Sequence, residues 1–329
     1  MKSATRLISL LAFIAAFTVA QTAAAADNFN RQDISFTSVG KKLGGWMYVP
    51  SGIKQGEKRP VIVMAHGWSA VKEMYLDDYA SRFANSGFVV VVFDYRNFGD
   101  SEGEPRNHID PSMQIEDYKN AITWATLQPM VDATRIGVWG SSYSGAHVLH
   151  LGAFDRRVKC VVSQVPLVNA TDNFRRLVRA DHFPGTQAWL AADRTEQYTT
   201  GKVNYLPVVD EQGKPSSLPT QDSYDWFIKT GQTRAPKWEN RNTVRSLELA
   251  LEYNPGANVH LISPTPLMMI VAQNDVLTPT DLAIEAYGRA RDPKQLVIIP
   301  GGHFDAYTGS GFQQSSAPAL NWFKQHLLK

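Results

Sequence analysis

Short apolar runs alternate along most of this chain with segments of helical periodicity, and this alternation constrains the fold more than any other feature. The runs are rich in β-branched and aliphatic residues and occupy residues 61–65, 88–93, 136–139, 158–165, 266–272 and 295–299. The helical segments occupy residues 72–84, 113–127, 144–153, 279–289 and 317–328. This order predicts an α/β fold with a mostly parallel central sheet, helices on both faces, and a leading antiparallel pair at 33–39 and 43–49.

The alternation stops in the middle of the chain. Residues 167–263 form a long polar stretch that is also rich in aromatic side chains. Because a structureless loop of that length is implausible in a compact domain, we interpret it as an inserted, partly helical cap. The expected organisation is a core in two parts, 27–166 and 264–329, with the cap at 167–263 between them.

The first 26 residues have the pattern of a signal peptide. Lys2 and Arg6 precede an apolar run at 7–20, and the small residues 24–26 offer a cleavage site before Asp27. The run is short for a membrane span, although a retained N-terminal anchor is the alternative. We therefore expect a secreted or periplasmic protein with no stable membrane anchor after cleavage.

The charge balance and the cysteine content limit which partners and cross-links we expect. The chain has 33 basic and 31 acidic residues, and without Lys2 and Arg6 the counts are 33 − 2 = 31 against 31. This balance predicts no nucleic-acid partner, and it does not define an oligomeric state. Cys160 is the single cysteine and lies in an apolar run, so no internal disulfide forms and we expect a buried, inert thiol.

Two serines compete as a nucleophile. Residues 99–103 read Gly-Asp-Ser-Glu-Gly and match the G-x-S-x-G pattern, which would select Ser101. A nucleophile elbow requires a strand, a tight turn and an immediate helix, but the residues after Gly103 are turn-forming and include Pro105. We therefore assign this match to a loop.

Ser142 lies in the required context. A strand-like run at 136–139 precedes it, a helical segment follows, and the small residues Gly140 and Ser144 flank it. Ser141 would instead be flanked by the bulky Trp139 and Tyr143. A helix-capping role is the alternative for Ser142.

The partners of a serine nucleophile follow in the expected order of acid and then base. Asp275 comes directly after the run at 266–272, and His303 follows the run at 295–299 in a glycine-rich loop. We therefore predict a Ser142–His303–Asp275 triad, with Asp281 and Asp305 as weaker candidates for the acid.

The oxyanion of an acyl-transfer intermediate needs two N–H donors. We expect them from the backbone of Tyr143, which follows the nucleophile, and of Trp68, which follows the run at 61–65. The Trp68 side chain either walls an acyl pocket or packs in its loop. His66 is expected to be structural, and Lys72 and Glu73 to open a helix and pair at the surface.

These motifs resemble the α/β-hydrolase superfamily. The resemblance rests on His66-Gly67, the loop at 94–101, the elbow, Asp275 and Gly302-His303, and it covers about 42–166 and 266–329 but not the cap. The Gly-x-Ser-Tyr-x-Gly elbow is similar to that of the cocaine esterase and X-prolyl dipeptidyl-peptidase group. The segments 66–106 and 302–307 are similar to the polyketide-transferase-like and dienelactone-hydrolase-like enzymes, although the latter use a cysteine nucleophile.

The sequence thus predicts a serine hydrolase that cleaves esters or thioesters of a small acyl substrate, without cofactor or metal. An X-prolyl peptidase with the same triad is the first alternative, and it would need an anionic subsite for the substrate amine. The second is a non-catalytic homologue that binds a ligand. The aromatic cap favours an apolar or aromatic substrate.

Overall fold

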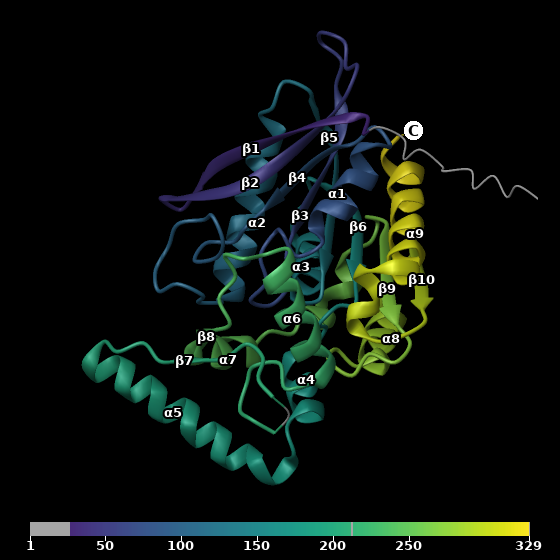
Figure 1. The fold of residues 1–329 in the computed structure, drawn as a ribbon. Helices are drawn as coiled ribbons and strands as arrows, with labels where there is room; N and C mark the ends of the chain where they lie inside the picture. Colours follow the sequence, from purple (N-terminus) through teal and green to yellow (C-terminus); the bar gives the residue numbers. More distant parts are fainter. Residues whose placement is uncertain (1–26, 212, 329) are drawn as a thin grey trace, which may run out of the picture.

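An eight-stranded sheet forms the centre of the computed structural model, which describes residues 27–328 except residue 212 (Figure 1). Its order is β1-β2-β4-β3-β5-β6-β9-β10, and the pairs from β4 through β10 are parallel, whereas β1, β2 and β4 pair antiparallel. The bounds are β1 Phe29–Ser38, β2 Lys41–Pro50, β3 Arg59–Ala65, β4 Val89–Phe93, β5 Val131–Ser141, β6 Val158–Gln164, β9 Leu267–Ala272 and β10 Lys294–Ile299. The predicted fold class is confirmed.

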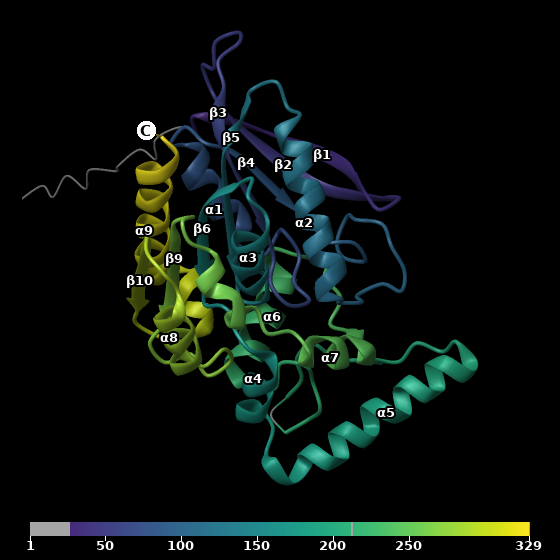
Figure 2. The ribbon, with the colours of Figure 1, turned by 180° about the vertical axis from the view of Figure 1, so that it is seen from behind.

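Helices cover both faces of this sheet (Figure 2). The helices α1 (Leu76–Ala84) and α9 (Gly309–Leu327) pack on one face, while α2 (Pro111–Thr126), α3 (Tyr143–Phe154) and α8 (Thr280–Arg289) pack on the other. Successive residues of β3 point to opposite faces of the sheet. Ile62 packs in the core on the side of α1 and α9, whereas Val61 and Val63 pack in the core on the side of α2, α3 and α8. Burial on both faces explains why these strands have continuous apolar sequences.

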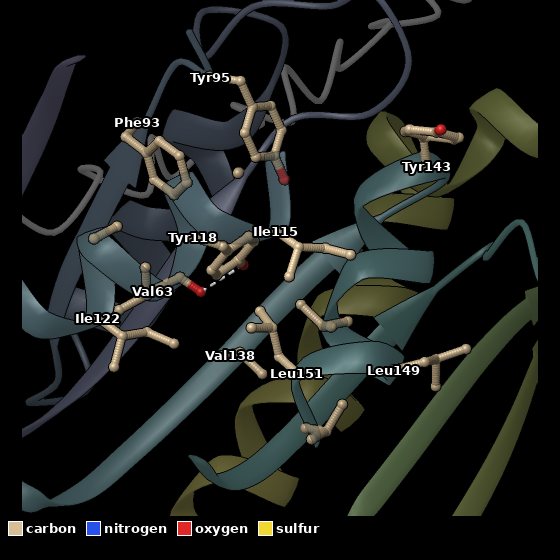
Figure 3. Packing of buried hydrophobic residues seen from close by; sticks show 14 of the residues in the cluster. Val63, Phe93, Tyr95, Ile115, Tyr118, Ile122, Val138, Tyr143, Leu149 and Leu151 are labelled. Atoms are coloured by element: carbon tan, nitrogen blue, oxygen red, sulfur yellow. Dashed lines mark hydrogen bonds between the residues drawn. The ribbon is translucent and has the colours of Figure 1, made fainter. Parts of the chain in front are cut away.

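Tyr118 of α2 fastens its helix to the strands that lead into the site (Figure 3). Its buried hydroxyl lies 2.9 Å from the carbonyl of Val63 in β3 and 2.7 Å from that of Trp139 in β5. The single hydroxyl proton can be donated to one of these carbonyls at a time. The ring also packs edge to face on Phe93 of β4, so α2 holds three adjacent strands together.

The segment 167–263 connects β6 to its sheet neighbour β9. It contains α4 (Ala170–Leu177), η1 (Ala180–His182), α5 (Phe183–Thr200), α6 (Gln221–Thr233), α7 (Val244–Leu251), η2 (Pro255–Leu261) and a small pair formed by β7 (Tyr205–Leu206) and β8 (Asn242–Thr243). Most of it gathers at one end of the sheet, and α5 projects away from the body of the protein (Figure 1, Figure 2). Its description as a cap domain stays a prediction.

Two helices begin at other residues than expected. The helix predicted from residue 72 begins at Leu76, because Lys72 is tied to a neighbouring loop and Tyr75 has a left-handed backbone with φ 67°. The helix predicted from residue 317 begins at Gly309 and contains Pro318 in its interior. Proline removes one backbone donor there, but the buried packing of Leu320 and Phe323 against the sheet outweighs this loss.

Two further sequence expectations concern the membrane and the cysteine. Among the residues that the structure describes, no helix is long and apolar enough to cross a membrane. The predicted signal peptide at 1–26 lies outside the described residues. Cys160 is fully buried in β6, as expected, and burial raises the pKa of its thiol well above the ordinary value.

Candidate active site

Ser142 lies on a sharp turn between the end of β5 and the start of α3. Its backbone has φ 60° and ψ −119°, a strained conformation for a residue with a side chain. A side chain at Gly140 would place Cβ 2.2 Å from the carbonyl oxygen of Ser144, so only glycine fits before the turn. The Ser142 N–H donates to the carbonyl of Gln164 in β6 at 2.9 Å, which fastens the turn to the sheet. This is the geometry of a nucleophile elbow.

Ser101 lies in a loop and has a different role. Its buried hydroxyl donates to the Asp94 carbonyl at 2.6 Å and accepts from the Gly44 N–H at 3.0 Å. These two bonds use the hydroxyl to join the loop after β4 to the edge of β2. The Ser101 side chain is therefore occupied with backbone partners rather than presented to a cavity.

His303 and Asp275 come together at the carboxyl ends of β10 and β9. The Nδ1 atom of His303 lies 2.8 Å from Oδ2 of Asp275, and both side chains are buried. A carboxylate accepts from this nitrogen, which leaves Nε2 without a proton in the neutral ring. The pair therefore has the tautomer that a general base requires.

The two weaker acid candidates lie elsewhere. Asp305 accepts from the backbone N–H of Gly302 at 2.7 Å and closes the turn before His303. Asp281 is exposed and pairs with Arg176 at 2.7 Å. Neither carboxylate is bonded to the His303 ring.

Thr278 is a further residue of this site, which sequence reasoning missed. Asp275 Oδ1 accepts the N–H groups of Leu277 at 2.9 Å and Thr278 at 2.7 Å, and its Oδ2 lies 2.9 Å from the Thr278 hydroxyl. The Thr278 hydroxyl also lies 3.0 Å from the Val165 carbonyl and can donate its single proton to one of the two acceptors at a time. The two backbone N–H groups and His303 Nδ1 hold the carboxylate in one orientation. Thr278 follows the acid by three residues, the spacing of a local side-chain turn, and that spacing was the available signal.

Two cavities meet at Ser142. The first, here called the leucine-rich cavity, has an empty volume of about 610 Å³ that includes some open solvent, and Ser142, Trp68 and Tyr143 form one end of it. The other walls come mostly from aliphatic side chains: Leu167, Leu177, Leu218, Leu247, Leu251 and Leu277.

The second, the aromatic cavity, has an empty volume of about 390 Å³ and contains both Ser142 and His303. Its aromatic walls are Trp68, Trp226, Phe227, Phe304 and Tyr307. Ser142 is therefore accessible from two apolar cavities, with Trp68 forming a wall of both.

Two backbone N–H groups next to the elbow are candidates for the predicted oxyanion site. Tyr143 is the first residue of α3, so its N–H has no partner within the helix. Gly67 approaches so closely that a Cβ there would lie 3.0 Å from Cβ and 3.5 Å from Oγ of Ser142. The Trp68 N–H belongs to the peptide unit that follows Gly67 and donates to no other group in the described part of the chain.

His66 orients the Gly67–Trp68 peptide unit. Its Nδ1 lies 3.0 Å from the Gly67 carbonyl, and its Nε2 accepts from the Tyr95 N–H at 3.4 Å. This pattern requires a neutral ring, and burial lowers the pKa of His66 to about 4. Because carbonyl and N–H point in opposite directions across a peptide plane, a fixed Gly67 carbonyl also fixes the Trp68 N–H.

Comparison with known proteins identifies the family. The X-Pro dipeptidyl-peptidase (S15) family model matches residues 40–305, which is most of the chain. The chain belongs to this family. The match spans β2 to β10 together with Ser142, Asp275 and His303.

Individual proteins also match this chain over most of its length. A thiohydrolase of Eupenicillium brefeldianum is 30% identical over 289 residues, covering 86% of this chain and 90% of the relative. The polyketide transferase grgF of Penicillium sp is 31% identical over 309 residues, covering 92% and 99% respectively. The solved structure of the α/β hydrolase GrgF has a TM-score of 0.78 and 30% identity, and covers 91% of this chain and all of that one. This S15 family member is thus a hydrolase of the α/β type.

Lys72 lies next to the Gly67 loop and is buried, not at the surface as expected. Its Nζ lies 2.8 Å from Asp94, 2.6 Å from Asp100 and 2.8 Å from Glu73. Burial alone would lower the pKa of Lys72, but the three carboxylates outweigh burial and raise it. The ammonium ion therefore occupies the centre of the one carboxylate cluster with metal-binding spacing among the described residues.

Replacing Gly67 with alanine is expected to lower kcat for ester hydrolysis about 100-fold, the cost of displacing one oxyanion donor. The new methyl group would lie 3.0 Å from Cβ of Ser142 and 3.2 Å from the Ser141 carbonyl, so the loop and the elbow must separate. Gly185→Ala is the matched control, because nothing lies within 4 Å of that position. Equal kcat values for the two variants would contradict the role of this loop.

Two buried histidines make stability depend on pH. Burial lowers the pKa of His66 to about 4 and that of His147 to about 3. Between pH 6.5 and 4 the unfolded chain binds protons at both rings while the folded protein does not. The contribution of these two rings to the free energy of unfolding is therefore fully present above pH 6.5 and declines towards pH 4. Each ring contributes about 1.4 kcal/mol per pH unit to the decline.

The His147→Gln variant isolates one of these contributions, and urea unfolding at pH 7 and pH 5 measures it. The Nδ1 atom of His147 lies 2.9 Å from the Tyr253 hydroxyl, and its Nε2 lies 3.0 Å from Oε1 of Gln114. The amide group of a glutamine at this position can still contact both partners. The variant is expected to lose less stability than the wild type on acidification. Equal losses would show that His147 is protonated in the folded state at pH 5.

Proposed function

We propose that the protein hydrolyses carboxylic esters or thioesters through an acyl-enzyme on Ser142. One observation carries this proposal: His303, joined to Asp275 at 2.8 Å, lines the same cavity as the strained Ser142 elbow. Without a base, the Ser142 hydroxyl would be a weak nucleophile. If Ser142 were not a nucleophile, its strained backbone would have no functional explanation.

The mechanism follows from the roles of these groups. His303 Nε2 takes the proton of Ser142 as Oγ attacks the substrate carbonyl carbon, and the negative charge of the tetrahedral intermediate faces the Tyr143 and Trp68 N–H groups. Asp275 stabilises the imidazolium that results. The proton passes to the leaving alcohol or thiol as its bond to carbon breaks, and an acyl-enzyme remains.

Deacylation repeats these steps with water. His303 takes a proton from a water molecule as its oxygen attacks the acyl carbon, and then returns the proton to Ser142 as the ester bond breaks. The products are a carboxylic acid and the free enzyme. Every proton transfer uses His303, so no cofactor or metal is required.

The substrate class follows from the cavity walls. The leucine-rich cavity offers its aliphatic walls to an acyl chain, whereas the aromatic cavity beside His303 suits the leaving group. A relative named thiohydrolase supports thioesters among the substrates. Relatives named polyketide transferase and acyltransferase make an alcohol a possible acyl acceptor in place of water, which product analysis would detect.

Peptide cleavage after proline is the alternative that the family model favours. Such a reaction needs an anionic group to bind the free amine of the substrate. Neither cavity at Ser142 has an aspartate or glutamate among its described lining residues. The structure therefore favours ester or thioester substrates.

A panel of chromogenic substrates tests the proposal. We expect the protein to hydrolyse p-nitrophenyl acetate, butyrate or octanoate and to leave Gly-Pro-p-nitroanilide intact. Anilide cleavage would support the peptidase, and failure on every ester and on acyl thioesters would favour a ligand-binding homologue. The Ser142→Ala variant, with unchanged circular dichroism, is the control for turnover by contaminants.

Export is part of the proposal. The signal-peptide pattern at 1–26 indicates a secreted or periplasmic protein, released at about Asp27. N-terminal sequencing of the protein from the periplasm or medium of an expressing bacterium tests this. A mature chain that keeps residues 1–26 in the membrane fraction would support the retained anchor instead.

A further inference from the structure

A third cavity lies in the inserted segment, outside the site described above. This outer hollow has an empty volume of about 740 Å³, including open solvent, and is lined by residues of α4 and the projecting helix α5 and by residues at the end of α7. Figure 2 shows how these three helices are arranged. Its apolar walls are Phe174, Phe183, Leu190 and Leu251. Exposed polar side chains surround it on the solvent side: Thr171, Arg175, Gln187 and Glu252.

The outer hollow and the leucine-rich cavity share two walls. Phe174 and Leu251 line both, so the far wall of the cavity that begins at Ser142 is also the inner wall of the hollow. Most residues that line the leucine-rich cavity are apolar, and Phe183 and Leu190 add further apolar walls in the hollow. The charged residues of the hollow, Arg175 and Glu252, are exposed.

Phe174 contributes an aromatic ring to this shared wall. Its half-buried ring stacks on Phe183 of α5 with centroids 5.6 Å apart and planes at 28°. α5 itself has only Leu190 and Asp193 buried among its 18 residues. A half-buried ring that lines two cavities and stacks on a mostly exposed helix has space to adopt another rotamer.

We propose that the outer hollow is a distal subsite for the end of a long, unbranched acyl chain, and that Phe174 gates the passage to it. The inference rests on the proposed function, because it assumes an acyl group on Ser142. A short acyl chain fits within the leucine-rich cavity. A longer one displaces the Phe174 ring, passes between Phe174 and Leu251, and brings its end towards the polar rim.

Three variants and a series of p-nitrophenyl esters test the gate. Phe174→Ala removes the shared wall, and we expect it to raise the ratio of kcat/KM for laurate or palmitate to that for butyrate about 10-fold. Gln187→Trp fills the hollow from an exposed position and is expected to lower the same ratio about 10-fold. Ala192→Trp is the matched control, because it adds the same side chain to an exposed position of α5 that lines none of the three cavities.

The outcomes separate the two proposals. Butyrate turnover by the wild type establishes esterase activity, and the chain-length ratio of each variant then tests the subsite alone. An unchanged ratio in Phe174→Ala, or equal ratios for Gln187→Trp and Ala192→Trp, would overturn the distal subsite. If the wild type hydrolysed no ester or thioester of any length, the proposed function would be wrong and the subsite would fall with it.

Discussion

Replacing Ser142 with alanine is expected to lower kcat for p-nitrophenyl esters by a factor on the order of 10⁴ to 10⁶, with little change in stability. In the proposed mechanism the hydroxyl is the only group of this residue that reacts, and without it no acyl-enzyme could form. The strained backbone of the elbow, with φ 60°, is the same for alanine as for serine, so the variant should fold. Steady-state assays with purified protein measure the loss.

Ser101→Ala is the matched control for this variant. Ser101 is the serine within the Gly-x-Ser-x-Gly pattern, but its hydroxyl joins the backbone of Asp94 and Gly44. The variant should lose some stability, on the order of 1 kcal/mol for the buried bonds, and keep its kcat. Loss of turnover in a folded Ser101→Ala protein, with activity retained in Ser142→Ala, would reverse the assignment.

Replacing Asp275 with asparagine is expected to lower kcat about 10⁴-fold through the tautomer of His303. Asp275 Oδ1 accepts two backbone N–H groups, so the carbonyl oxygen of asparagine would keep that position. Its NH₂ group would then face His303 Nδ1 as a donor. The ring would carry its proton on Nε2 instead, where it cannot accept the proton of Ser142.

Asp281→Asn provides the comparison for this second variant. Asp281 is exposed and pairs only with Arg176, so its loss should leave kcat within about twofold of the wild type. In the proposed mechanism Asp275 contacts His303 and not the substrate, so KM should change little in Asp275→Asn. A large rise in KM with unchanged kcat would show that Asp275 binds substrate rather than orienting His303.

The main elements of the sheet, and the strand ends that position the three proposed catalytic residues, could be predicted because their signals are local. The strands of the parallel sheet are buried on both faces, so each appears as a short apolar run. Ser142, Asp275 and His303 each follow such a run, and the carboxyl ends of parallel strands meet at one edge of a sheet. The structure places the last two within 2.8 Å of each other.

Features that depend on distant contacts could not be predicted in this way. Lys72 looks like a surface residue in sequence, but residues Asp94 and Asp100 of another loop surround its ammonium group. The start of α9 eight residues before Ala317 depends on packing against the sheet rather than on the position of Pro318. The cavities lined by the segment 167–263 likewise depend on how α4, α5 and α7 pack against one another. The sequence pattern of each helix does not show this packing.

Covalent labelling with a fluorophosphonate, followed by mass mapping of the modified peptide, tests the central claim most directly. The account predicts a single adduct on Ser142, formed also in Ser101→Ala and absent in Ser142→Ala. Slow labelling of Asp275→Asn would further show that the hydroxyl depends on the His303–Asp275 pair. An adduct on Ser101, or no adduct on a protein that hydrolyses esters, would contradict Ser142 as the nucleophile.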